Sequence, residues 1–244
     1  MSSGQACVLY GIAAFSKDGD WIIREDEKSC AAVIDVLEKH NAKYRLGAPL
    51  DVRWLSQGWS SHFEFMTNDE YRARTDFVSR APRIDDIERL WQSAYCRDNI
   101  EMVDIQNLML IKQTRRSRDY NVIGALAEAC GSSGDNAECA LRYLQDYTKL
   151  AEAVKKWPDE ARRIERPAVK LLLRNAARHD VVSELAVERD SLIEQDEQRI
   201  QSYRDRAREY NRGFSALSRQ WKQDNTRLSH QHRQLCTLAL EILK

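Results

Sequence analysis

The chain has 244 residues, of which 43% are hydrophobic, so it can bury one sizeable core or a core with a helical appendage. Lysine plus arginine equals aspartate plus glutamate at 38 each, so no net field draws the protein toward nucleic acid or a membrane surface. No apolar run approaches the roughly 20 residues that span a bilayer, and the N-terminus lacks a basic stretch followed by an apolar signal core. We therefore expect a cytoplasmic protein with no membrane partner.

The six cysteines are scattered along the chain and form no C-x-x-C pair. In a chain of this size and class, such spacing predicts reduced thiols and argues against both a disulfide framework and a zinc site. Two histidines near the C-terminus, His230 and His232, are two residues apart and fall on different faces of a helix. We expect no metal pair from them.

The first 125 residues or so mix strand and helix signals. Two apolar runs, residues 8–15 and 21–23, flank a Lys-Asp-Gly-Asp segment. They predict either paired strands or a strand and a short helix that lead into a second strand. Residues 29–40 carry apolar side chains at helical spacing, which predicts a helix.

A β-hairpin is predicted over residues 62–78. Phe63 and Phe65 share one face of its first strand, and a Thr-Asn-Asp-Glu turn leads into the second strand at residues 71–78. On that second strand Arg72, Arg74 and Asp76 point to one side. Asp104 then has the character of an N-cap for a helix that extends to Lys112.

The second half is predicted to be almost entirely helical. Residues 137–156 form one amphipathic segment, and Pro158 and Pro167 mark breaks. Beyond residue 169 two or three long helices follow, with an apolar stripe at three-four spacing: Ile200, Tyr203, Ala207, Tyr210, Phe214, Leu217, Trp221 and Leu228. We expect two domains, residues 1–130 and 136–244, separated by a loop at residues 131–134.

This stripe is more aromatic than a dimeric coiled coil prefers. We therefore expect the C-terminal helices to fold back on residues 137–173 within one chain and to form a bundle. A monomer follows from this packing, and a homodimer through the same face is the alternative.

Carboxylates in the first half are the candidate catalytic and metal-binding groups. Asp18 and Asp20, two residues apart on an extended segment, point to the same side, and Asp76 joins them if the hairpin lies beside that segment. Mg²⁺ prefers such hard oxygen ligands. The alternative is that Asp18-Gly19-Asp20 is a polar turn, since Asp-Gly is a common turn dipeptide.

The order of these motifs resembles the bacterial nucleotidyltransferase-fold superfamily, in particular its toxin-type and aminoglycoside-type members. The resemblance covers about residues 8–128 and depends on one series of motifs: Gly11, Asp18-Gly19-Asp20, the helix to His40, Asp76, and a helix that reads Leu108-x-x-x-Lys112-x-x-x-Arg116-x-x-Asp119. It implies an α+β fold, with a mixed sheet and flanking helices followed by an α-helical bundle.

The resemblance also implies an activity: Mg²⁺-dependent transfer of a nucleoside monophosphate from an NTP to a small molecule, an RNA or a protein. By the same resemblance, Asp18, Asp20 and Asp76 hold the metal and act as catalytic residues. Gly11, Lys112, Arg116 and Asp119 bind the nucleotide, and a toxin–antitoxin role is conceivable by analogy. Ile12 follows Gly11, where the family usually has Gly or Ser. The alternative is therefore an inactive binding or interaction module on the same fold.

Overall fold

The computed structural model describes residues 1–97, 99–132 and 136–243. Its contacts divide the chain into two compact units, one of Met1–Val103 with Gln201–Lys244 and one of Asp104–Ile200. The predicted domain boundary near residue 130 falls inside the second unit, and the helical second half contributes to both units. None of the helices in the described ranges is both long enough and apolar enough to cross a membrane.

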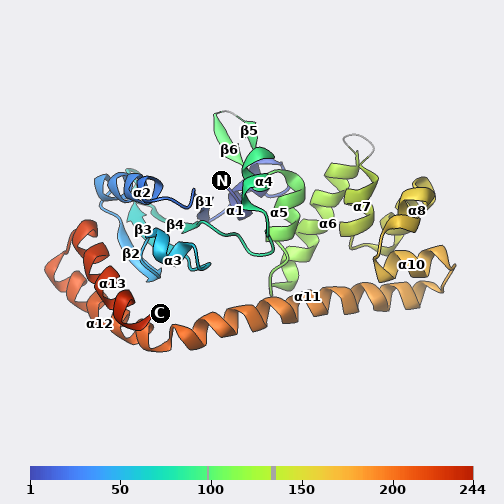
Figure 1. Cartoon of the computed structure of the whole chain (residues 1–244). Coiled ribbons are helices and arrows are strands. Elements are labelled where there is room, and N and C mark those ends of the chain that lie inside the picture. The colour runs from blue at the N-terminus through green and yellow to red at the C-terminus, as the bar shows by residue number, and fades with distance from the viewer. Residues whose placement is uncertain (98, 133–135, 244) are drawn as a thin grey trace. The chain divides into compact units, whose positions relative to one another are not determined.

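A four-stranded mixed sheet organises the first unit (Figure 1). Its strands lie in the order β1 (Asp18–Ile22), β4 (Arg72–Val78), β3 (Ser61–Met66) and β2 (Lys43–Gly47). β3 and β4 form the predicted antiparallel hairpin, β2 pairs antiparallel with β3, and β1 runs parallel to β4. The expectation that the hairpin lies beside the first Asp-rich segment is confirmed.

Met1–Val103 also contains further helices and strands. They are α1 (Ser3–Leu9), α2 (Glu27–Lys39), α3 (Val52–Leu55), α4 (Ile87–Gln92), β5 (Tyr95–Arg97) and β6 (Ile100–Met102). The predicted helix at residues 29–40 is confirmed as α2, which begins after Asp26, whose side chain accepts a hydrogen bond from the Ser29 amide at 2.7 Å.

The first apolar run, residues 8–15, is not a strand. α1 ends at Leu9 and the first strand begins only at Asp18. The alternative that Asp18-Gly19-Asp20 is a turn is wrong. This segment is part of β1, and its backbone pairing with β4 keeps it extended.

One face of the sheet is apolar and carries the core of the first unit. Phe63 and Phe77 project from it and pack with α2, α12 (Arg208–Asp224) and α13 (Leu228–Ile242). Five residues of the predicted stripe are buried in this core: Ala207, Tyr210, Phe214, Trp221 and Leu228.

The burial of the stripe is as predicted, but the surface that covers it is not. α12 and α13 pack on α2 and β2 within the first unit, so the expected bundle with residues 137–173 is wrong. The aromatic rings on the sheet explain this choice, since they offer a broad apolar surface that needs a cover. Gly213 allows close approach of the two helices, because a Cβ there would lie 2.7 Å from a methyl carbon of Leu238.

The second unit is helical. It contains α5 (Ile105–Ile111), α6 (Ser117–Ser132), α7 (Ala137–Tyr143), α8 (Tyr147–Lys156), α9 (Pro158–Arg163), α10 (Pro167–Leu173) and most of α11 (Arg178–Arg206). The α+β class, with a mixed sheet, flanking helices and a following helical region, is confirmed.

Two local predictions in the second unit need correction. Residues 137–156 form two helices, since Leu144 leaves the helical conformation and Asp146 caps α8 through the Lys149 amide. The loop predicted at residues 131–134 is wrong for Gly131 and Ser132, which belong to α6; residues 133–135 lie outside the described ranges.

Candidate functional site

The polar face of the sheet brings together the three predicted aspartates. Asp20 on β1 lies opposite Asp76 on β4 in the strand register, and Asp76 lies opposite His62 on β3. Residues opposite one another project to the same side of a sheet, and so do residues two apart on one strand. Asp18, Asp20 and Asp76 therefore share the face opposite Phe63 and Phe77, and we call these three residues the acidic sheet face.

Asp76 already has two basic neighbours. His62 Nδ1 lies 2.8 Å from Asp76 Oδ1, a close electrostatic contact that is not aligned as a hydrogen bond. Arg45 Nη2 lies 3.4 Å from the same oxygen and reaches it from β2 beside a bulge between Tyr44 and Leu46. The Asp76 side chain is 21% exposed, so this carboxylate is held in place and still accessible.

Asp18 provides the test of whether a cation suits this face. Its Oδ1 atom is buried and accepts no hydrogen bond from the described residues. A buried carboxylate oxygen without a partner is costly, and a bound cation would remove that cost. The donor set, three hard carboxylates, is the type that Mg²⁺ prefers.

The three carboxylates are not closed around one point. Among the described residues their ligand atoms do not all come within 4.8 Å of one another. An ion would therefore have to draw the side chains together by rotation about their χ angles. The residue types and the strand register fit a divalent metal, although the three side chains do not yet surround a single point.

Gly11, the predicted phosphate-contacting glycine, lies in the loop after α1 and not after a strand. Its φ is +74°, in the left-handed region that favours glycine, and no atom would crowd a Cβ there. Open space around Gly11 is compatible with close approach of a ligand. The backbone conformation alone is sufficient reason for a glycine at this position.

The predicted Lys112–Asp119 helix is interrupted. α5 ends at Ile111 and α6 begins at Ser117, so Lys112 and Arg116 do not lie on successive turns of one helix. Lys112 is only 7% exposed. Asp119 is buried and accepts hydrogen bonds from Thr114 Oγ1 at 2.6 Å and from Arg116 Nε at 3.0 Å.

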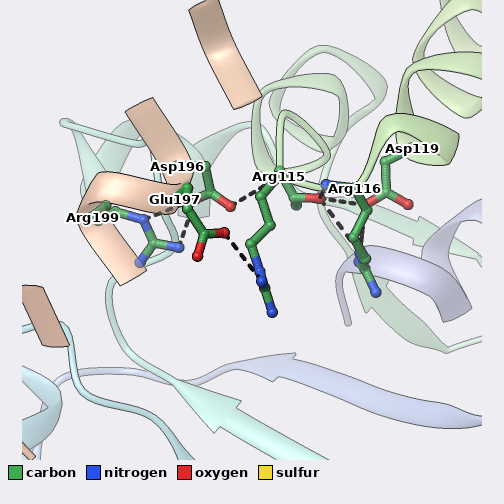
Figure 2. A network of polar contacts seen from close by, with 7 residues as sticks. Arg115, Arg116, Asp119, Asp196, Glu197 and Arg199 are labelled. Carbon is green, nitrogen blue, oxygen red and sulfur yellow. Dashed lines mark hydrogen bonds and ion pairs between the residues drawn. The ribbon is translucent and has the colours of Figure 1, made fainter. Parts of the chain in front are cut away.

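A carboxylate from α11 explains this interruption. Asp196 is buried and accepts a hydrogen bond from the backbone amide of Arg115 at 2.8 Å (Figure 2). Arg199 donates to the same side chain, and Arg115 Nη1 pairs with Glu197 at 3.1 Å. The amide of Arg115 is thus satisfied outside a helix, and its guanidinium is paired with a carboxylate.

A second cluster of polar side chains was missed by the sequence analysis. Asp51, His232 and Cys236 each offer a ligand atom, and these atoms lie within 4.8 Å of one another in the part of the chain that the structure describes. The signal in the sequence was the spacing of His232 and Cys236, four residues apart and hence on one helix face. Spacing rules applied to cysteines alone or to histidines alone do not find such a mixed pair.

No protein-family model and no curated protein sequence matches this chain. Among solved structures, it is similar to a provisionally assigned nucleotidyltransferase from Helicobacter pylori, with 15% sequence identity and a TM-score of 0.40, over 81% of this chain and 87% of that chain. It is also similar to JHP933 from Helicobacter pylori, with 15% identity and a TM-score of 0.39, over 82% of this chain and 86% of that chain. Likenesses at these scores carry no argument about activity, so the functional reasoning depends on the residues themselves.

Proposed function

We propose that the protein is a nucleotidyltransferase that binds Mg²⁺ and an NTP at the acidic sheet face. The observation that carries the proposal is the register of β1 and β4, which sets Asp20 directly beside Asp76. The buried Oδ1 of Asp18 on the same face, which has no hydrogen-bond partner among the described residues, adds to it. The transferred group is a nucleoside monophosphate, pyrophosphate is the leaving group, and the acceptor class is a small molecule, an RNA or a protein.

Each residue of the face has a proposed task. Asp18, Asp20 and Asp76 would hold Mg²⁺, which would offset the negative charge that develops on the phosphate groups during transfer. Asp76 also accepts the proton of the attacking acceptor group, and its carboxylate accepts a hydrogen bond from Arg45 Nη2 at 3.4 Å. The guanidinium of Arg45 supplies positive charge on the same face.

The remaining predicted nucleotide contacts have weaker support. Lys112 and Asp119 are buried, so we assign them to holding the α5–α6 turn. The Arg116 side chain is half exposed although it pairs with Asp119, and its contact with the nucleotide stays a prediction. We propose that Gly11 contacts phosphate. A toxin–antitoxin role is a proposal from the family resemblance alone.

We also propose that the protein is a monomer, because five residues of the aromatic stripe are already buried within one chain. Light scattering of the purified protein should then give a mass near 28.3 kDa. A stable mass of twice that value would favour the homodimer.

One observation favours the second candidate, an inactive nucleotide-binding module. Asp76 is in contact with His62 and Arg45, so its charge is partly offset without a metal. On this alternative the face binds a nucleotide or a partner and performs no transfer.

The deciding experiment uses NTPs labelled at the α-phosphate, because the label then follows the transferred group. Purified protein, Mg²⁺ and cell extract are incubated with each NTP in turn. The wild type should label an extract component, Asp20→Asn and Asp76→Asn should not, and Glu64→Gln should behave as the wild type. Glu64 lies on the same sheet face but pairs with Arg72, which makes it the matched control.

Two outcomes distinguish the candidates. Metal-dependent NTP binding without transfer, unchanged in Asp76→Asn, would support the binding module. Absence of both NTP transfer and NTP binding in the wild type would rule out both proposals.

A further inference from the structure

We infer that Asp51, His232 and Cys236 form a Zn²⁺ site in the first unit, separate from the acidic sheet face and independent of the proposed transferase activity. We call these three residues the Asp-His-Cys cluster. It joins Asp51, the N-cap of α3, to two residues of α13, an element far away in the sequence. An ion there would fasten the C-terminal helix to the segment that follows β2.

The two ligands on α13 have the separation that zinc requires. His232 and Cys236 are four residues apart, and Cys236 Sγ lies 3.6 Å from His232 Nε2. In a tetrahedral site with Zn–S of about 2.3 Å and Zn–N of about 2.0 Å, the sulfur and nitrogen are about 3.5 Å apart. The helix therefore presents both atoms at the edge length of a zinc tetrahedron.

The imidazole is oriented for this role by a buried tyrosine. His232 Nδ1 lies 2.8 Å from the hydroxyl oxygen of Tyr44, which accepts a hydrogen bond from the backbone amide of Leu50 at 2.9 Å and can accept a second one from Nδ1–H when Nε2 binds a metal. Tyr44 itself is buried in the core. Metal-binding histidines are commonly held through their second ring nitrogen in this way, and the contact leaves Nε2 directed at Cys236.

The third ligand, Asp51, is occupied by an arginine that can leave. Arg53 Nε and Nη2 lie 2.8 and 2.7 Å from the two carboxylate oxygens of Asp51. The Arg53 side chain is 49% exposed, so its guanidinium can turn into solvent. Asp51 can keep its capping bond to the Arg53 backbone amide, 2.9 Å from Oδ1, while the other oxygen turns to the metal.

The donor set selects the metal. A thiolate, an imidazole and a carboxylate together suit Zn²⁺, whereas Mg²⁺ takes oxygen ligands only. Three protein ligands leave a fourth position for water. Zn²⁺ and the Arg53 guanidinium are thus alternative cations for one carboxylate.

The test uses the full chain, purified without a polyhistidine tag and freed of metal by a chelator. Co²⁺ is added as a spectroscopic substitute for Zn²⁺, because Co²⁺ bound to a thiolate gives a charge-transfer band in the near ultraviolet. The wild type should show the band at one Co²⁺ per chain, and Zn²⁺ should abolish it. Cys236→Ser should lack the band, and Cys96→Ser, which removes an exposed cysteine, should keep it.

Two further variants guard against misfolding and test the competition. Asp51→Asn keeps a good helix cap but offers a poorer metal ligand, so the midpoint of the Zn²⁺ titration should move to higher concentration. Arg53→Ala removes the competing cation, so the midpoint should move to lower concentration. A wild type that binds no stoichiometric Co²⁺ or Zn²⁺ would overturn the inference, as would a band that persists in Cys236→Ser.

Discussion

Asp20 and Asp76 lie opposite one another on parallel neighbouring strands, β1 and β4. Neighbouring strands are about 4.8 Å apart, so two aspartates in this register can reach one cation. Two like charges this close repel unless a positive group lies between or beside them. Arg45 supplies that positive group on the Asp76 side, and a divalent ion would supply more positive charge.

Metal binding at this pair should be non-additive. If Asp20 and Asp76 hold the same ion, Asp20→Asn and Asp76→Asn should each weaken Mn²⁺ binding by more than about tenfold. Tenfold is the smaller loss seen when a residue that only supports a metal ligand is changed, and a direct ligand should matter more. The double variant should lose little more, because either change already removes the site. Free Mn²⁺ measured by electron paramagnetic resonance gives the affinities, and additive losses would mean two separate ions.

The buried carboxylate of Asp196 should be among the most sensitive positions of the second unit. Its carboxylate accepts hydrogen bonds from the Arg115 backbone amide and from the Arg199 guanidinium. Asp196→Ala leaves that amide without its partner, so we expect the free energy of unfolding to fall by about 3 kcal/mol. Glu194→Ala, an exposed change on the same helix, should stay within about 0.5 kcal/mol in the same urea titration. Equal losses in the two variants would contradict the role of Asp196.

Local periodicity predicted the strand and helix faces well. The alternation around Phe63 and Phe65 identified the β3–β4 hairpin, and the three-four spacing of the aromatic stripe identified buried positions of α12. Periodicity reports which side chains avoid water, but not which surface covers them. For that reason the pattern does not distinguish residues 137–173, the expected partner, from α2 and β2, which cover the stripe.

The misread residues depend on contacts from distant parts of the sequence. Asp196 lies 81 residues beyond Arg115 and accepts a hydrogen bond from its backbone amide. This contact interrupts the continuous helix that the sequence pattern predicts from Leu108 to Asp119. Asp51 reaches His232 and Cys236 only because the sheet core packs against α13. No window of the sequence contains these pairs, so spacing rules could not reveal them.

Two glycines with left-handed backbone allow a matched comparison. Gly11→Ala introduces only conformational strain, since nothing lies within 4 Å of the new methyl group, and should cost about 1 kcal/mol. Gly47 has φ +87°, and a Cβ there would overlap the carbonyl oxygen of Ser60. Gly47→Ala should therefore cost about 3 kcal/mol or more in thermal unfolding. Equal costs would show that the chain relaxes around Gly47 without loss.

Trp221 should be the main anchor of α12. It is buried and its Nε1 donates to Gln234 Oε1 at 2.6 Å. Trp221→Ala should lower the unfolding free energy by about 4 kcal/mol, measured by guanidinium denaturation. Leu240→Ala on α13 is the control, because Leu240 is exposed and its truncation should change stability by less than about 0.5 kcal/mol.

The contact between α2 and α13 should be sensitive to acid. Ser229 donates hydrogen bonds from its hydroxyl, at 2.8 Å, and from its amide, at 3.2 Å, to Glu38 Oε1, and they lower the pKa of this carboxyl below its usual 4.5. A depressed carboxyl pKa stabilises the fold above the unfolded value, and that contribution is lost as pH falls through the folded value. Between about pH 5 and pH 3 the wild type should therefore lose more stability than Glu38→Gln. Urea titrations across this range measure the difference, with Glu209→Gln, an exposed change on α12, as the control. If Glu38→Gln and the wild type lose stability in parallel, Glu38 does not contribute through its charge.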